Sequence, residues 1–413
     1  MSRHPRRDEP TGTDALCDEA ARDGTTRHET SRDDVTVVLG TTSPGIEDVA
    51  RDEGTALLER GGVAVVASQV RGLDRPGVVT WEIQTIDPDG SGDADAQAAN
   101  RILRERVGAA LGCARSLYHV VVHLAELAWD GTTIESLVSA VDKVPLDDMA
   151  SATSFRASCT RVGEHAFHSP DVERAVGTAI QSRYGTAVDL EGYDLNVRVD
   201  ITGRRAFCGY QLTGRKGLDR RYPWQYHPRV TLRTTVAYAL LVLSGYPDAP
   251  GALHDPFCGS GTILLEALSV AREGDHECRV SGSDWDQVAV HGAKRNLVAA
   301  GFPGTDVFLS DARSVSEVMA AGSLDFIITN PPFGIRLGSH ADFRGLYDAF
   351  LREAARLLRP GGTLTILVGK RRGTFNRVLR GRVEYALSHV RVIEIGGVFP
   401  AIFVLKRTTA ASA

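Results

Sequence analysis

Long apolar segments and paired cysteines are both missing from this sequence. Among its 413 residues no hydrophobic run approaches the roughly 20 residues that span a bilayer, so we expect no membrane contact. The six cysteines are dispersed, without a C-x-x-C pair or clustered histidines beside them, which argues against a zinc site. Reduced thiols in a cytoplasm fit this pattern best, and we expect a cytoplasmic protein that holds no metal.

Residues 1–34 lack the apolar core that a secretory signal peptide requires. They are charged and polar throughout, which predicts a disordered tail. The whole chain exceeds the length at which one hydrophobic core keeps growing, so two or three domains are expected. A hydrophobic content of 43% and a charged content of 24% are typical of a soluble globular protein.

Positive charge is in deficit overall but concentrated in two clusters. The net charge of −5 does not favour a nucleic-acid partner, since phosphate contacts come mostly from Lys and Arg. The first cluster, with Asp219 as its only acid, comprises Arg204, Arg205, Arg215, Lys216, Arg220, Arg221, Arg229 and Arg233; the second, without an acid, comprises Lys370, Arg371, Arg372, Arg377, Arg380 and Arg382. Either cluster alone is explained as a charged surface that faces water. Two clusters that flank one active site instead favour a surface that contacts the phosphates of a nucleic acid.

Two patterns of secondary structure divide the chain. Residues 35–150 predict a compact α+β unit, a second such unit follows over 151–215, and from 216 to 413 strands alternate with helices, which predicts a parallel, doubly wound sheet. The predicted helices are 47–60, 101–111, 134–144, 169–184, 234–243 and 262–272. The predicted strands are 35–39, 63–70, 78–86, 118–124, 154–161, 194–201, 206–212, one ending at 255, 279–283, 307–309, 325–329, 363–368 and 401–406. The segment 87–97, rich in Asp and Gly, is predicted as a loop or an insertion.

A glycine-rich turn, DPFCGSGT from Asp255 to Thr262, joins a predicted strand to a predicted helix. Gly259 and Gly261 allow a tight turn and a close approach of the backbone to a ligand, and Asp255 closes the strand at the edge where open α/β sheets bind ligands. The turn departs from G-x-G-x-x-G and has no Walker lysine, so dinucleotide and phosphate-loop sites are disfavoured. It predicts a site for another nucleotide-like cofactor.

Acidic residues follow the next two strands. Asp284 comes where a doubly wound fold places an acid that accepts hydrogen bonds from ribose hydroxyls, and Asp286 is its nearest competitor. Asp311, followed by Ala312, is placed to take a proton of an adenine amine after the third strand. Isolated acids at such positions are more often helix caps, but their order along successive strands favours a shared site.

The sequence Asn330-Pro331-Pro332-Phe333 follows an apolar strand. Two prolines rigidify the exit and leave backbone carbonyls without helical partners. An exocyclic base amine is a poor nucleophile, because its lone pair is delocalised into the ring. Accepting its hydrogens at the Asn330 side chain and the Pro331 carbonyl would localise that pair, while Phe333 stacks on the base. Cysteine-nucleophile chemistry is disfavoured, because no cysteine follows Cys278.

These motifs together resemble those of the class I methyltransferases, with DPFCGSGT as the cofactor motif and NPPF as the amino-methylating motif. The stretches FRASCTRVGEHAFHSPDVERAVGTAI and LTGRKGLDRRYPWQYHP are similar to the THUMP-containing RNA methyltransferases, and the match runs from about residue 35 to the end. The resemblance implies a ferredoxin-like domain over 35–150, a THUMP-like module over 151–215 that grips the 3′ acceptor end of tRNA, and a Rossmann-like catalytic domain over 216–413. It also implies S-adenosylmethionine (SAM) as cofactor and guanosine N2 as the acceptor.

The resemblance also assigns roles to individual residues. Those expected to hold the cofactor are Asp255, Phe257, Gly259, Gly261, Thr262, Asp284, Asp311, Ala312 and Asn330. Those expected to hold the target base are Asn330, Pro331, Pro332 and Phe333. The family's RGYR-like stretch reads RRYPW over 220–224 here, and 87–97 has no counterpart. The resemblance therefore does not define which site in the RNA is modified.

The substrate is predicted to be tRNA, with ribosomal RNA as the nearest alternative. N-methylation of a small molecule is a second enzymatic interpretation. A non-catalytic RNA-binding protein is a third, and the intact NPPF motif argues against it. DNA adenine methylation shares this motif but is disfavoured by the THUMP-like stretch.

Overall fold

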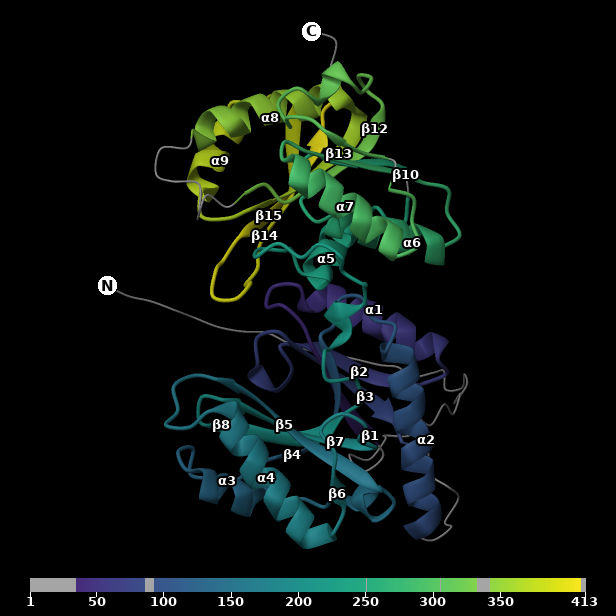
Figure 1. The fold of residues 1–413 in the computed structure, drawn as a ribbon, viewed down its shortest axis with the longest axis vertical. Helices are drawn as coiled ribbons and strands as arrows, with labels where there is room; N and C mark the ends of the chain where they lie inside the picture. The colour runs from purple at the N-terminus through teal and green to yellow at the C-terminus, as the bar shows by residue number, and fades with distance from the viewer. Residues whose placement is uncertain (1–34, 86–92, 250, 305, 333–341, 410–413) are drawn as a thin grey trace, which may run out of the picture.

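The computed structural model describes residues 35–85, 93–249, 251–304, 306–332 and 342–409. The tail predicted over 1–34 lies outside these residues. The described chain forms two units, each built on one β-sheet and joined end to end by a linker between residues 211 and 234 (Figure 1). No described helix is both long and apolar enough to cross a membrane.

The N-terminal unit is an eight-stranded sheet with helices packed on it (Figure 1). In spatial order its strands are β2 (Val65–Val70), β3 (Val78–Gln84), β1 (Val35–Thr41), β4 (His119–Glu126), β8 (Arg205–Gln211), β7 (Leu195–Thr202), β5 (Ser154–Val162) and β6 (Ala187–Val188). Its helices are α1 (Glu47–Arg60), α2 (Asp93–Leu111), α3 (Ile134–Val141) and α4 (Ser169–Tyr184). Because β4 pairs with both β1 and β8, the two predicted α+β units share one continuous sheet.

Two hydrophobic cores stabilise this sheet. One gathers apolar residues of α1, α2, β1 and β3 around the fully buried Trp81, and the other joins α3 and α4 to β5, β7 and β8. A Cβ on Gly54 would lie 2.2 Å from the Trp81 ring, so α1 packs this closely only because that residue is glycine.

The predicted loop over 87–97 is wrong at its C-terminal end, because α2 already begins at Asp93. Residues 86–92 lie outside the described part of the chain. The alternation of Asp with Ala in this stretch hid a helical first turn, in which acidic residues are favoured by the helix dipole.

The C-terminal unit is a seven-stranded sheet. In spatial order its strands are β11 (Val307–Leu309), β10 (Arg279–Asp284), β9 (Ala252–Asp255), β12 (Leu324–Thr329), β13 (Leu358–Val368), β15 (Ala401–Arg407) and β14 (Tyr385–Val392). Its helices are α5 (Thr234–Ser244), α6 (Thr262–Glu273), α7 (Gln287–Ala299), α8 (Phe343–Leu357) and α9 (Arg372–Leu379). The strand order reverses between β9 and β12, and a ligand binds at the carboxyl ends of strands at such a point.

The prediction of an entirely parallel sheet is wrong at one edge. β15 pairs antiparallel with both β13 and β14, whereas the other described pairs of this sheet are parallel. The chain returns from β14 to β15 through residues 393–400, where Gly396 and Gly397 adopt positive φ angles of 57° and 80°. A connection this short joins antiparallel neighbours, because a parallel crossover needs a dozen or more residues.

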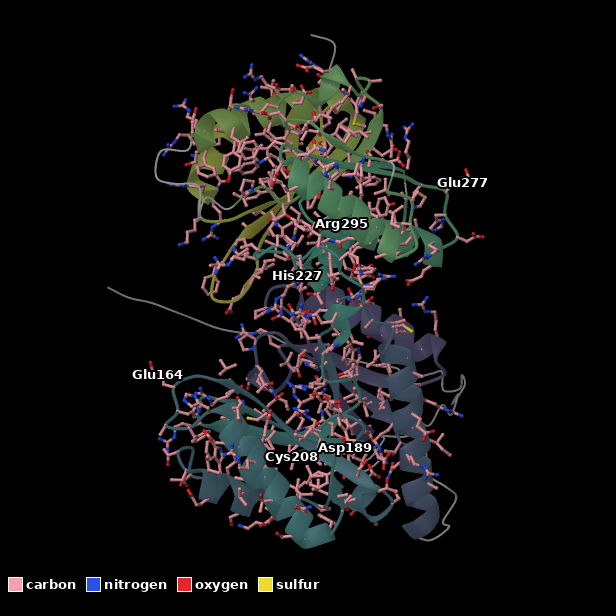
Figure 2. All side chains as sticks on the ribbon, viewed as in Figure 1. Glu164, Asp189, Cys208, His227, Glu277 and Arg295 are labelled. Carbon is pink, nitrogen blue, oxygen red and sulfur yellow. The ribbon has the colours of Figure 1, made fainter. Side chains whose placement is uncertain are left out.

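The two units are docked against each other through buried contacts. Ile46 of the N-terminal unit is fully buried within the core of the C-terminal unit, and the Glu394 amide donates to the Pro44 carbonyl at 2.8 Å. Arg391 on β14 forms a bidentate ion pair with Asp48. Side chains fill the junction, where His227 of the linker lies (Figure 2). The linker therefore runs along the junction of two docked bodies, and many of its residues stay exposed.

Candidate active site

The glycine-rich turn leaves the carboxyl end of β9 and leads into α6, as predicted. Gly259 and Gly261 have φ angles of 52° and 82°, in the left-handed region that favours glycine. The Phe257 amide donates to Asp255 Oδ1 at 3.1 Å, and the Cys258 amide donates to the Ser283 carbonyl at 3.0 Å. The turn is thus fixed to the ends of both β9 and β10.

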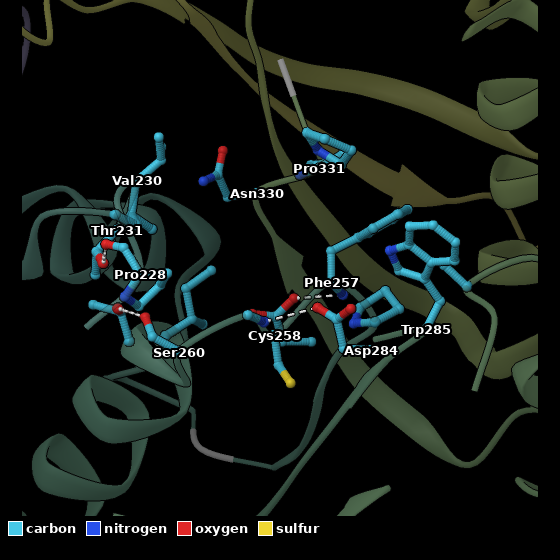
Figure 3. A pocket seen from close by; sticks show the side chains of 18 of the residues that line it. Pro228, Val230, Thr231, Phe257, Cys258, Ser260, Asp284, Trp285, Asn330 and Pro331 are labelled. Carbon is cyan, nitrogen blue, oxygen red and sulfur yellow. Dashed lines mark hydrogen bonds between the residues drawn. The ribbon is translucent and has the colours of Figure 1, made fainter. Parts of the chain in front are cut away.

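Asp284, at the end of β10, faces this turn (Figure 3). Its Oδ2 accepts from the Gly259 amide and its Oδ1 from the Asp286 amide, both at 3.0 Å. Burial raises the pKa of this carboxyl above its ordinary value, against the effect of these hydrogen bonds. Asp286, the competing candidate, instead caps α7 by accepting from the Val288 amide at 2.9 Å.

A cavity of about 800 Å³ opens in front of the turn, within the usual size of a small-molecule site. The predicted residues that line it are Asp255, Phe257, Gly259, Thr262, Asp284, Asp311, Ala312, Asn330, Pro331 and Pro332. Gly261 lies at the start of α6 and is not among the lining residues, and Phe333 falls outside the described residues. The structure therefore brings together motifs that are more than 70 residues apart in sequence.

Four parts of the cavity wall outside the glycine-rich turn were not predicted from the sequence. They are the linker residues Pro228–Leu232, Trp285, Arg313 and Leu346. Figure 3 shows Pro228, Val230 and Thr231 across the cavity from Asp284 and Trp285. Trp285 directly follows the predicted site residue Asp284, and this position was the signal that the sequence offered. Its 75% exposure, unusual for so large an apolar side chain, is known only from the structure.

Asp311 is held by Arg313, which also lines the cavity. The Arg313 Nε donates to Oδ1 at 2.9 Å and to Oδ2 at 3.0 Å, and a second guanidinium nitrogen also contacts Oδ2. These hydrogen bonds lower the pKa of Asp311 below its ordinary value. The carboxylate predicted to meet an adenine amine is therefore charged and already has one partner.

The side-chain oxygen of Asn330 is buried and accepts no hydrogen bond from the described residues. Asn330 follows β12, and the preceding Thr329 donates its hydroxyl to Asp255 Oδ1 at 2.6 Å, which ties the two motifs together. An unpaired buried acceptor is costly unless a ligand satisfies it. Asn330 itself lines the cavity, so this unsatisfied acceptor belongs to a residue of the cavity wall.

Two family models match this chain: the RMKL-like methyltransferase domain over residues 224–400 and the THUMP domain over residues 131–208. A curated relative, tRNA (guanine(6)-N2)-methyltransferase of Thermus thermophilus, is 38% identical over 331 residues, which cover 79% of this chain and 95% of the relative. The chain belongs to the THUMP-domain-containing class I methyltransferases.

Solved structures share the fold of this THUMP-domain methyltransferase. TrmN from Thermus thermophilus, at 33% identity, superposes with a TM-score of 0.65 and covers 90% of this chain and 99% of its own. A putative methyltransferase complexed with SAH, at 18% identity, has a TM-score of 0.66 and covers 92% and 100% of the two chains; it shows the fold alone. The predicted fold class is confirmed. The THUMP match begins at residue 131, within the range predicted for the first domain, and the boundary at 150/151 stays a prediction.

In this methyltransferase, complete burial raises the pKa of Asp255 to about 7, outweighing the hydrogen bonds from Thr329 and Phe257. Between its ordinary pKa near 4 and pH 7, the folded state keeps a proton that the unfolded state releases, so stability falls as pH rises through this window. Asp255→Asn cannot ionise and retains an acceptor oxygen. From pH 4 to pH 7 the wild type should lose stability that the variant keeps. We therefore expect the free energy of unfolding of the variant, relative to that of the wild type, to rise by at most about 4 kcal/mol over this range.

Urea denaturation at both pH values measures this difference. Asp311→Asn is the matched control, because the pKa of Asp311 is lowered and its charged form is the stabilising one. That variant should lose stability at neutral pH relative to the wild type. Parallel pH profiles for Asp255→Asn and the wild type would show that Asp255 is already ionised in the folded protein.

Proposed function

We propose that this methyltransferase transfers a methyl group from SAM to the exocyclic N2 amine of a guanosine in tRNA. The observation that carries the proposal is the buried side-chain oxygen of Asn330, which has no hydrogen-bond partner among the described residues and belongs to a residue of the cavity wall beside the glycine-rich turn. The guanine N2 amine offers the hydrogens that such an acceptor requires. The name of the Thermus relative, tRNA (guanine(6)-N2)-methyltransferase, supports tRNA as the substrate and the nucleotide at position 6 as its target.

The residues of the cavity fit SAM. Gly259, in the left-handed region, leaves the turn without a side chain where a ligand must approach. Asp284 presents a carboxylate to ribose hydroxyls. Trp285 offers an exposed indole face for an adenine ring, while Asp311 is the partner for its amine. When bound, SAM supplies a methyl group activated by a sulfonium.

The protein's own part in the reaction is to orient the acceptor amine. Asn330 Oδ1 accepts one amine hydrogen, and the Pro331 carbonyl accepts the second, which directs the nitrogen lone pair towards the methyl donor. Both prolines hold this segment rigid, and the hydroxyl of Thr329 anchors it to Asp255. No strong base is required, because the amine loses its proton after the transfer.

The direct test is transfer of labelled methyl groups from SAM to unmodified tRNA and, separately, to ribosomal RNA, followed by nucleoside mass spectrometry. Label in N2-methylguanosine from tRNA is the expected result, and digestion to fragments then places it at or away from position 6. Label found only in ribosomal RNA would show that ribosomal RNA, and not tRNA, is the substrate. SAM binding without label in either RNA would favour a small-molecule acceptor.

The two basic clusters divide into structural and exposed residues. In the first cluster Arg205 pairs with Glu126, Arg221 pairs with the buried Glu266, and Arg204 donates to the Asp130 carbonyl at 2.8 Å. In the second cluster Arg382 is held by Asp348. The exposed cations of the two clusters that form no ion pair with another described residue are Arg215, Lys216, Arg220, Arg229, Lys370, Arg371, Arg377 and Arg380. We propose that these exposed cations, which come from both clusters, contact RNA phosphates.

Replacing one residue of each cluster tests this footprint. Arg229 lines the cavity and Arg371 precedes α9, and we expect Arg229→Ala and Arg371→Ala each to lower the slope of log K against log salt by about 0.7 to 0.9 per lost phosphate contact. Filter binding to tRNA between low and physiological salt measures it. Arg279→Ala is the control, because Arg279 begins β10 at the opposite edge of the sheet. An unchanged slope for Arg229→Ala or Arg371→Ala would show that the cluster containing that residue does not contact RNA.

A further inference from the structure

The linker between the two units forms one wall of the cavity. It runs from the end of β8 at Gln211 to the start of α5 at Thr234, and η4 (Leu218–Arg220) is its one short 3-10 turn in this described segment. Pro228–Leu232 line the cavity directly across from Asp284 (Figure 3). A segment with so little secondary structure keeps one position only if side chains elsewhere satisfy its backbone groups.

One buried side chain, Asn296 on α7, satisfies three of those groups, at Gln225 and Tyr226. Its Oδ1 accepts from the Gln225 amide at 2.9 Å and from the Tyr226 amide at 2.8 Å, and its Nδ2 donates to the Tyr226 carbonyl at 2.8 Å. Its remaining Nδ2 hydrogen goes to the Ser260 carbonyl, at 2.9 Å, in the glycine-rich turn. All four hydrogen-bonding positions of the amide are therefore filled, and Asn296 is 1% exposed.

The helix surface around Asn296 is shaped for the same linker. Gly292 lies one turn earlier on α7, and a Cβ there would come within 2.1 Å of the Tyr226 ring. Residues four apart share one face of a helix, so Gly292 receives the ring where Asn296 holds the backbone. At the other end of the linker, Arg221 donates to the Arg115 carbonyl at 2.6 Å, which fixes it to the N-terminal unit.

We infer that Asn296 is a positioning residue for the cofactor pocket: its one side chain fixes the linker wall against the glycine-rich turn. It is not among the residues that line the cavity, so it acts through Tyr226 and Ser260. Without Asn296, the ligand itself would have to order the linker against the glycine-rich turn. The free energy spent on that ordering would weaken ligand binding. The inference rests on the proposed use of this cavity for SAM.

The test measures SAM binding by calorimetry in the absence of RNA. For Asn296→Ala we expect the Kd for SAM to rise about tenfold or more, while tRNA affinity without SAM stays close to that of the wild type. Asn196→Ala is the matched control, because Asn196 is also buried and its Oδ1 accepts from the Ser158 hydroxyl at 2.7 Å in the N-terminal unit. It should lower the melting temperature and leave the Kd for SAM unchanged.

A second variant keeps the inference testable if Asn296→Ala folds poorly. Gly292→Ala adds a methyl group against Tyr226 while improving the helix propensity of α7, so the protein should fold and bind SAM more weakly. Unchanged SAM affinity in either folded variant, with wild-type binding intact, would overturn the positioning role and leave the proposed function standing. Failure of the wild type to bind SAM would instead overturn the proposed function.

Discussion

Replacing Asn330 with alanine will lower kcat for methyl transfer by about 100- to 1000-fold, the range seen when one group that stabilises a transition state is removed. The Kd for SAM should change only severalfold. The reason lies in the buried Asn330 oxygen, which has no partner among the described residues and is therefore available to the acceptor amine. Because the cofactor turn is held by Asp284 and Asp255 instead, its geometry survives the substitution.

Single-turnover kinetics with labelled SAM and calorimetry of SAM binding separate these two effects. Asn376→Ala serves as the control, since it makes the same truncation at an exposed site on α9. A kcat that falls together with a large loss of SAM affinity would place Asn330 in the cofactor site and leave the amine without its acceptor.

The parts of this site that the sequence predicted are short, local motifs at strand ends. Asp255 and Asp284 end β9 and β10, and Asn330 directly follows β12. The carboxyl ends of parallel strands meet at one edge of a sheet. Their convergence could be predicted because the topology alone brings them together. Phe333, from the same reasoning, lies outside the described residues and its role stays a prediction.

The parts that the sequence did not predict depend on contacts between distant segments. Asn296 looks like an ordinary polar residue on a helix, and only the path of the linker across α7 gives it four partners. Likewise, Arg221 belongs to a basic cluster in the sequence, yet in the fold it pairs with the buried Glu266. Charge patterns along a chain do not distinguish a cation that binds phosphate from one that joins two domains.

The fold shows the same division. Hydrophobic periodicity located α1 to α6 and most strands, because each burial pattern is local. It gave no range for α7, α8, α9, β6 or β14. Strand direction is not local, so β15 was predicted as another parallel strand although the short return from β14 makes it antiparallel. The two α+β units predicted for the N-terminal half form one continuous sheet because β4 pairs with β8, and no local pattern indicates that pairing.

Arg115→Ala is expected to lower the free energy of unfolding by about 3 to 5 kcal/mol, the cost of leaving a buried charge without its main partner. Arg115 precedes β4 but its side chain enters the C-terminal unit, where Nη1 donates to Glu266 Oε2 at 2.9 Å and Nη2 contacts Glu273. Burial disfavours its charge, yet the two carboxylates outweigh this effect and raise its pKa. Urea denaturation measures the loss.

Arg205→Ala is the matched control, because Arg205 forms an exposed pair with Glu126 whose loss should cost about 1 kcal/mol or less. A double variant with Arg115→Met and Glu266→Met removes both charges and should be more stable than Arg115→Ala. A loss in Arg115→Ala no greater than that in Arg205→Ala would mean that Arg221 alone satisfies Glu266.

The pH dependence distinguishes a lost ion pair from lost packing. Burial raises the pKa of Glu266 above its ordinary value, against the effect of Arg221 and Arg115, so removing Arg115 raises it further. At low pH the folded variant keeps Glu266 neutral, so the loss comes from packing and from the contact with Glu273. As pH rises, the unfolded state releases the Glu266 proton and the deficit grows. We therefore expect Arg115→Ala to be more destabilised at pH 8 than at pH 5. A deficit equal at both values would assign the effect to packing at the junction, since a missing side chain has the same volume at every pH.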